Sequence, residues 1–137
     1  MWEFLRPAIE VSLPPLAYPA SDIEMTRLLA NLLAGRMECW LGVKYGANAR
    51  EVVVYGVMVT EVKEDTGTSA RCLWLYAIYG WRGVPPALVK TGFERLKTYA
   101  RQRECKAIAG VTNVDQVIGI TRQLGGDVTY TILRLEV

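Results

Sequence analysis

The 137-residue sequence contains no histidine. Histidine is the commonest general base near neutral pH and the commonest side-chain ligand of transition metals. Its absence excludes Ser-His-Asp and Cys-His mechanisms. Any proton transfer must therefore use a carboxylate, a tyrosine, a lysine, a cysteine, a chain terminus or water.

Three cysteines, Cys39, Cys72 and Cys105, are the other residues whose chemistry stands out. Each lies among apolar residues in a predicted strand or just before one, and their number is odd. This pattern favours buried free thiols in a reducing compartment over a disulfide or a nucleophile. The cysteines do not have the spacing of a metal-binding cluster, so we expect no metal site.

Composition indicates one folded domain. Hydrophobic residues make up 51% of the chain and charged residues 22%, which is enough apolar material for a real core. The formal net charge of +2 is too small to indicate nucleic-acid binding by itself. The sequence has no apolar run of about 18 residues and no signal-peptide pattern at Met1–Arg6. We therefore expect a cytoplasmic protein without a membrane span.

The spacing of apolar residues and the turn signals predict the elements that must position any site. Helices are predicted over residues 2–12, 21–35, 86–103 and 115–124. Strands are predicted over residues 37–43, 52–62, 72–79, 107–111 and 127–135. Ser21 and Glu24 have the spacing of a capping box at the start of the second helix.

The proline-rich stretch Leu13–Pro19 predicts an extended connector after the first helix. We therefore divide the chain into an N-terminal helix and connector, residues 1–20, and a single domain, residues 21–137. Residues 72–79 are apolar on both faces, which predicts a strand in the middle of the sheet. Tight turns predict an antiparallel meander of three strands, followed by a parallel strand–helix–strand unit. The expected fold is α/β, with a mixed sheet of about five strands and helices on both faces.

This order of elements resembles the GNAT fold of N-acetyltransferases over roughly residues 21–137. Leu33–Leu41 resembles the end of the family's second helix leading into its second strand. Thr112–Gly126 resembles the family's late helix and the glycine that follows it. The short N-terminal helix, the Leu-Ala-Gly-Arg stretch and a weakened cofactor motif also resemble small GNAT-like proteins of tailed bacteriophages. For a phage-encoded protein, this resemblance implies a location in the host cytoplasm or the virion.

The resemblance implies a site for acetyl-CoA where the family's fourth and fifth strands separate. In the family, the pyrophosphate lies on backbone N–H groups of a Gln/Arg-x-x-Gly-x-Gly/Ala loop at a helix start. Arg82 and Ala87 match the ends of this pattern, but Pro85 replaces the central glycine, and Pro85 and Pro86 each lack an N–H group. The prolines are also simply favourable residues for starting a helix. The residues assigned to the cofactor are Tyr79, Gly80, Arg82, Gly83, Ala87 and Asn113.

The resemblance also points to catalytic positions. Many members of the family protonate the departing thiolate with a tyrosine seven residues after an asparagine, but counting from Asn113 gives Ile120 or, with a shift of one, Thr121. Neither can act as the acid. Tyr130 in the last predicted strand, or Tyr76 or Tyr79 in the central one, would have to substitute, unless these tyrosines only pack in the sheet.

Glu61 is the best candidate for the general base. It lies near the end of the strand predicted over residues 52–62, where members of the family often place a carboxylate. Desolvation there would raise the pKa of Glu61 toward a useful range. The alternative is that Glu61 faces solvent near the strand end, and Glu38 is a more distant second candidate.

Three functions remain open from the sequence. The first is acetyl transfer from acetyl-CoA to an amine. The second is an inactive GNAT-shaped structural or interaction protein, such as a bacteriophage virion or connector component, that binds itself or other proteins. Four tryptophans in one small domain and a docking arm at Leu13–Pro19 would suit such an assembly. The third is a sensor that binds a CoA-like molecule without chemistry.

Overall fold

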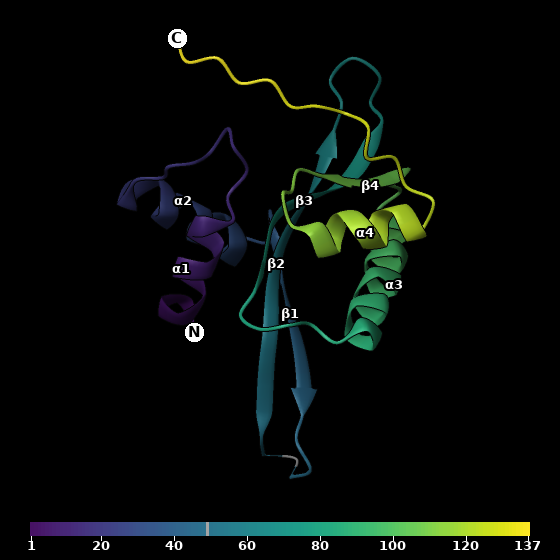
Figure 1. The fold of residues 1–137 in the computed structure, drawn as a ribbon. Coiled ribbons are helices and arrows are strands. Elements are labelled where there is room, and N and C mark those ends of the chain that lie inside the picture. The colour runs from purple at the N-terminus through teal and green to yellow at the C-terminus, as the bar shows by residue number, and fades with distance from the viewer. Residues whose placement is uncertain (49) are drawn as a thin grey trace.

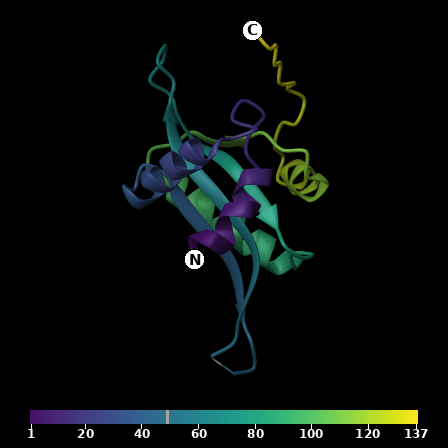
Figure 2. The same cartoon turned by 90° about the vertical axis from the view of Figure 1, so that its left-hand side faces the viewer.

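The computed structural model describes residues 1–48 and 50–137. The helices are α1 (Trp2–Val11), α2 (Asp22–Leu33), α3 (Pro86–Gln102) and α4 (Asp115–Gln123), and the strands are β1 (Glu38–Tyr45), β2 (Val52–Glu64), β3 (Arg71–Gly80) and β4 (Ala107–Gly110). Helices α1 and α2 cover one face of the sheet, and α3 and α4 lie on the other (Figures 1 and 2). The predicted α/β fold with helices on both faces is therefore confirmed.

The sheet has the order β1-β2-β3-β4 among the described residues. Strands β1, β2 and β3 form the predicted antiparallel meander, and β4 pairs with β3 in parallel. Strand β3 is thus an inner strand, as its two apolar faces predicted. Two register shifts interrupt the β ladder, at Gly42/Val43 and at Val59/Thr60. The second shift matters for the site, because it lies at the level where β3 and β4 separate.

The capping box predicted at the start of α2 is confirmed. The Glu24 backbone N–H donates to the Ser21 hydroxyl oxygen at 3.2 Å, and the Ser21 N–H donates to the Glu24 carboxylate at 2.9 Å. The two residues thus satisfy each other's free backbone donors, which fixes where the helix begins.

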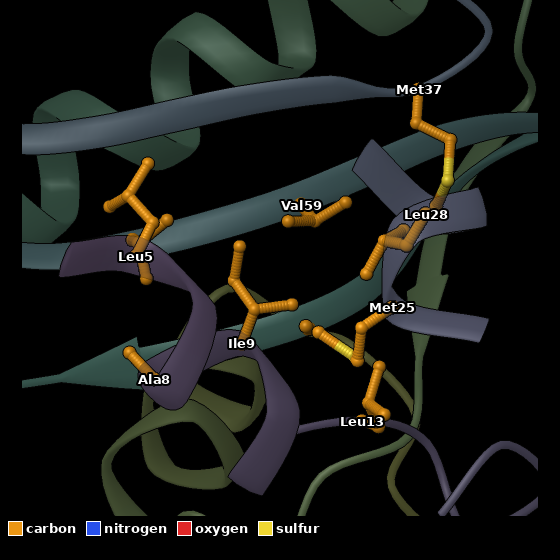
Figure 3. Packing of buried hydrophobic residues seen from close by; sticks show 10 residues of the cluster. Leu5, Ala8, Ile9, Leu13, Met25, Leu28, Met37 and Val59 are labelled. Carbon is orange, nitrogen blue, oxygen red and sulfur yellow. The ribbon is translucent and has the colours of Figure 1, made fainter. Parts of the chain in front are cut away.

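Two apolar clusters of unequal size form the core. The larger cluster joins α1 and α2 to the sheet, and its ten buried residues are Leu5, Ala8, Ile9, Leu13, Met25, Leu28, Met37, Val57, Val59 and Ala77 (Figure 3). The smaller cluster lies under α3, and its four buried residues are Leu73, Leu75, Leu96 and Ala100. Helix α4 contributes no buried residue. The α3/α4 side of the sheet is therefore the less completely packed of the two.

The strand predicted over residues 127–135 does not form, so the sheet has four strands in the described residues instead of five. The sequence there is rich in β-branched and aromatic residues, but strand propensity becomes a strand only where a partner edge accepts the hydrogen bonds. Instead, the Arg134 guanidinium donates to the carbonyl oxygens of Pro15 and Tyr18. These bonds hold the segment beside the α1–α2 connector.

The cysteines are free, as predicted, but they are not buried. Cys72 and Cys105 are half-buried and Cys39 is exposed. Cys39 lies in β1, an edge strand, so the sheet shields it on one side only. No helix within residues 1–48 and 50–137 is long and apolar enough to cross a membrane.

Candidate functional site

Strands β3 and β4 run together for only four residues and then separate. Their pairing extends from Cys72–Ala107 to Leu75–Gly110. Beyond Leu75, β3 continues to Gly80 beside β2, whereas the chain leaves β4 after Gly110. A Cβ atom on Gly110 would lie 2.8 Å from the Leu75 Cβ, so only glycine allows the strands to approach this closely before they diverge. The two strands are no longer paired beyond Leu75 and Gly110, and we call this place the opening.

A β-bulge marks the same level on the other side of β3. Val59 is paired with Ala77 and Thr60 with Leu75, so Tyr76 has no register partner on β2. It has none on β4 either, because that pairing ends at Leu75. Bulges free backbone groups and redirect side chains, and they are common beside active sites. Tyr76 therefore lies at the bulge, level with the point where the pairing of β3 and β4 ends.

The loop that leads from β3 to α3 is anchored at its start. The Trp81 N–H donates to the Tyr55 carbonyl oxygen at 2.9 Å, and the Trp81 ring stacks on Phe4 with the ring centres 4.7 Å apart. The guanidinium carbon of Arg82 lies 5.8 Å from the centre of the Tyr55 ring. These contacts anchor the part of the loop that carries the exposed Arg82.

The loop retains free donors in spite of its two prolines. Helix α3 begins at Pro86 with Pro85 as its N-cap, and no side chain caps it. The backbone N–H groups of Gly83, Val84 and Ala87 donate to no acceptor within the described part of the chain. Free N–H groups at a helix start, together with the helix dipole, favour an anion. The two prolines thus lack N–H donors, but the loop keeps other backbone N–H groups that are free.

The structure brings most of the predicted cofactor residues to one region. Gly80, Arg82, Gly83 and Ala87 are exposed in or beside this loop. Asn113 is exposed in the segment between β4 and α4. That segment approaches the loop, because the Gln116 side-chain amide at the start of α4 donates to the Val84 carbonyl oxygen at 3.2 Å. The sequence analysis missed Gln116, whose role depends on a contact 32 residues away along the chain.

Tyr79 is placed differently from the other predicted cofactor residues. Its ring is half-buried against the α1/α2 core cluster. It contacts Trp81 edge-on, with the ring centres 5.5 Å apart. The Tyr79 side chain therefore packs in the fold.

Glu61 lies next to the β-bulge. Its side chain is 25% exposed and lies 3.7 Å from the Lys63 ammonium group. Burial raises the pKa of the neighbouring Tyr76, and the charges of Glu61 and Glu24 raise it further. Because Glu24 belongs to α2, this arrangement places Glu61 and Tyr76 together on the α1/α2 side of the sheet. The sequence had suggested both residues separately but not as a pair.

Tyr130 does not join this pair. Its side chain is 88% exposed and lines a groove on the α3/α4 side of the sheet. The two predicted catalytic residues, Glu61 and Tyr130, therefore lie on opposite sides of the sheet.

The second carboxylate candidate, Glu38, accepts hydrogen bonds from the Tyr99 hydroxyl at 2.7 Å and the Thr60 hydroxyl at 3.2 Å. The Tyr99 bond ties α3 to β1, and the Thr60 bond ties β1 to β2.

The groove on the α3/α4 side has a volume of about 960 Å³. Helix α3, strand β4, helix α4 and the C-terminal segment line it. Its cationic residues are Lys97, Arg101, Lys106 and Arg122. Within the described residues, no group of three or more Cys, Asp or Glu side chains could hold a metal ion.

No protein-family model matches the sequence, and no curated protein matches it significantly. Solved structures do match the fold. An aminoglycoside acetyltransferase from an uncultured soil metagenomic sample superimposes with a TM-score of 0.66 at 12% identity, covering 99% of this chain and 88% of that one.

Two further acetyltransferases match equally clearly. A ribosomal-protein-alanine N-acetyltransferase from Brucella melitensis gives a TM-score of 0.62 at 16% identity, covering 98% of this chain and 92% of that one. A predicted acetyltransferase from Clostridium acetobutylicum, crystallised with acetyl-CoA, gives 0.62 at 20% identity, covering 86% and 77%. The chain therefore has the GNAT fold of acetyltransferases.

Proposed function

We propose that this protein binds acetyl-CoA at the opening between β3 and β4 and transfers the acetyl group to an amine. The observation that supports this most directly is the separation of the two strands at Leu75 and Gly110, next to a loop with free backbone donors. Similar solved structures are acetyltransferases, and one of them contains acetyl-CoA.

The loop residues suit the phosphates of the cofactor. The N–H groups of Gly83, Val84 and Ala87 are unpaired within the described residues, and the Arg82 side chain supplies a positive charge beside them. Gly80 and Asn113 lie at the margins of the same region. When bound, acetyl-CoA supplies the activated acetyl thioester, and the backbone groups around Tyr76 would polarise its carbonyl.

The residues beside the bulge suit the proton transfers. Glu61 would accept the proton from the attacking amine, directly or through water. Tyr76 would provide the acid that the late helix lacks, because burial and the nearby carboxylates raise its pKa and keep the phenol protonated. Tyr130 is the weaker candidate for that role, since it lies across the sheet from Glu61.

Titration calorimetry with acetyl-CoA and CoA tests the cofactor site. We expect micromolar binding that weakens at least tenfold in Arg82→Ala and is unchanged in Arg27→Ala, which removes an exposed arginine from α2. Pro85→Gly should strengthen binding, because it restores a backbone donor. No heat at millimolar ligand would refute the proposal.

Acetylation of a panel of amines tests the chemical roles. Glu61→Gln and Tyr76→Phe should each lower turnover by a factor of about 100 or more, while acetyl-CoA binding stays within twofold of the unsubstituted protein. Tyr130→Phe is the matched control and should leave turnover unchanged. Loss of turnover in Tyr130→Phe alone would transfer the acid role to that residue.

The alternative is a GNAT-shaped interaction protein, such as a phage virion or connector component. It is favoured by the unpaired C-terminal segment, where Leu133 and Leu135 are 87% and 88% exposed. Absence of CoA binding together with a stable protein complex would support this alternative. Binding of CoA without turnover on any amine would support a sensor.

A further inference from the structure

One lysine of the chain lies against the candidate general base. The sequence has five lysines, which are Lys44, Lys63, Lys90, Lys97 and Lys106. Within the described residues, Lys63 is the lysine that forms an ion pair, with its Nζ 3.7 Å from the Glu61 Oε1. A primary amine of the chain itself therefore lies beside the carboxylate to which we assign the proton of an attacking amine.

The strand geometry explains why Lys63 and Glu61 meet. They are two residues apart in β2, beyond the register shift at Val59/Thr60, where the pairing with β3 is regular again. Residues two apart on a strand project from the same face of the sheet. Lys63 therefore shares the α1/α2 side of the sheet with Glu61 and Tyr76.

Trp74 provides a second contact for the same ammonium group. The Lys63 Nζ lies 4.7 Å from the centre of the Trp74 ring. A carboxylate together with an aromatic face is a favourable environment for an alkylammonium ion. Trp74 pairs with Ala109, directly before the last pair of β3 and β4, Leu75 with Gly110. The ammonium group thus lies over a residue that adjoins the opening.

The Lys63 side chain is free to move toward the opening. It is 53% exposed, and exposed ion pairs such as the one with Glu61 are weak. Lysine also has a flexible four-carbon stem that can carry its amine to a new position. The same side chain can therefore leave Trp74 and approach a thioester held at the opening.

We propose that the protein acetylates its own Lys63. This inference rests on the proposed function, because it uses the same acetyl-CoA and the same base. Glu61 takes one proton from the Lys63 ammonium group, and the freed electron pair of Nζ forms a bond with the acetyl carbonyl carbon. The C–S bond breaks, the sulfur takes a proton from Tyr76, and the second proton of the nitrogen passes to water. The net change converts an ammonium group and a thioester into an amide, a thiol and one proton.

Peptide mass spectrometry of the purified full chain, incubated with acetyl-CoA, tests this proposal. Lys44 is exposed in β1 and reports the rate at which acetyl-CoA modifies any accessible lysine. Acetylation of Lys63 should be faster than that of Lys44 by a factor of about ten or more, because its amine is held beside a base. The rate constant should not depend on protein concentration, since the reaction is intramolecular.

Two variants separate the base from the acceptor. Glu61→Gln should reduce the rate at Lys63 to that at Lys44. Lys63→Arg keeps the positive charge and should remove the fast addition of one acetyl group to the intact chain, whereas Lys44→Arg should leave it unchanged. A rate at Lys63 equal to that at Lys44, or an undiminished rate at Lys63 in Glu61→Gln, would overturn the proposal. A rate constant proportional to protein concentration would also overturn it, because one copy would then be modifying another.

Parallel assays of free amines and of cofactor binding show which idea has failed. If free amines are acetylated but Lys63 reacts no faster than Lys44, self-acetylation is wrong and the proposed function stands. If calorimetry detects no acetyl-CoA binding, the proposed function is wrong and self-acetylation is wrong with it.

Discussion

Thr60→Val is the substitution whose effect follows most directly from the structure. Thr60 has no exposed surface, and it is the one buried polar residue among those that the structure describes. Its hydroxyl accepts a hydrogen bond from the Trp40 indole N–H at 2.9 Å and donates one to the Glu38 carboxylate at 3.2 Å. Valine has almost the same shape but can make neither bond.

The expected loss is about 2 kcal/mol of unfolding free energy. The bond from Trp40 is worth about 1 kcal/mol, and the bond to the charged Glu38 about 1.5–3 kcal/mol when fully buried. Trp40 and Glu38 are half-buried, so water recovers part of this loss. The added methyl group returns about 0.8 kcal/mol of burial.

Urea unfolding measured by circular dichroism checks this prediction. With an m-value of about 2 kcal/mol per molar urea, the midpoint should fall by about 1 M without a change in slope. The double variant Thr60→Val/Trp40→Phe should lose less than the sum of the single losses, because the indole N–H no longer lacks a partner. Thr60→Ser keeps the hydroxyl and should lose only about 1 kcal/mol. If Thr60→Val were as stable as the unsubstituted protein, the hydroxyl would not be serving these partners and our reasoning would be refuted.

Further predictions concern the strand separation and the pH dependence of stability. Gly110→Ala should lower the unfolding free energy by about 1–3 kcal/mol, because its Cβ would lie 2.8 Å from the Leu75 Cβ. Gly92→Ala in α3 has open space around the added methyl and should raise the unfolding free energy by about 0.5–1 kcal/mol. Burial and the hydrogen bond to Glu38 raise the pKa of Tyr99, so stability should fall as pH rises past about 10, where the unfolded chain releases this proton first.

The same unfolding assay decides these cases. Equal effects of Gly110→Ala and Gly92→Ala would show that the close approach of β3 and β4 is not enforced at Gly110. For the pH effect, Tyr99→Phe should flatten the fall in stability above pH of about 10. An unchanged fall in that variant would mean that other groups, such as Tyr76, account for it.

Local sequence signals predicted most of the elements correctly. The Ser21–Glu24 capping box depends on groups three residues apart, so the sequence was sufficient to predict it. Tight turns force neighbouring strands to pair, which is why the antiparallel meander followed from the sequence. The loop from Gly80 to Ala87 was also recognisable, because its glycines, arginine and prolines lie together along the chain.

The candidate site was only partly predictable, because its members meet through long-range contacts. Glu61 and Tyr76 lie on the same side of the sheet because of a β-bulge, and the contact of Gln116 with Val84 depends on how α4 docks. Tyr130 was assigned to a strand that does not form. No local pattern indicates which face of a sheet a side chain occupies once a bulge has shifted the alternation.

The sequence by itself determined that the chain is a mixed α/β domain, that histidine chemistry is excluded, and where each helix and the first four strands lie. Tertiary structure alone decided that Glu61 and Tyr76 share one side of the opening, that Cys39 is exposed, and that the last predicted strand finds no partner. The physical reason is that the hydrogen bonds of helix caps and turns join groups only a few residues apart. The backbone hydrogen bonds of a strand need a strand edge that another part of the chain, or another copy of it, must supply.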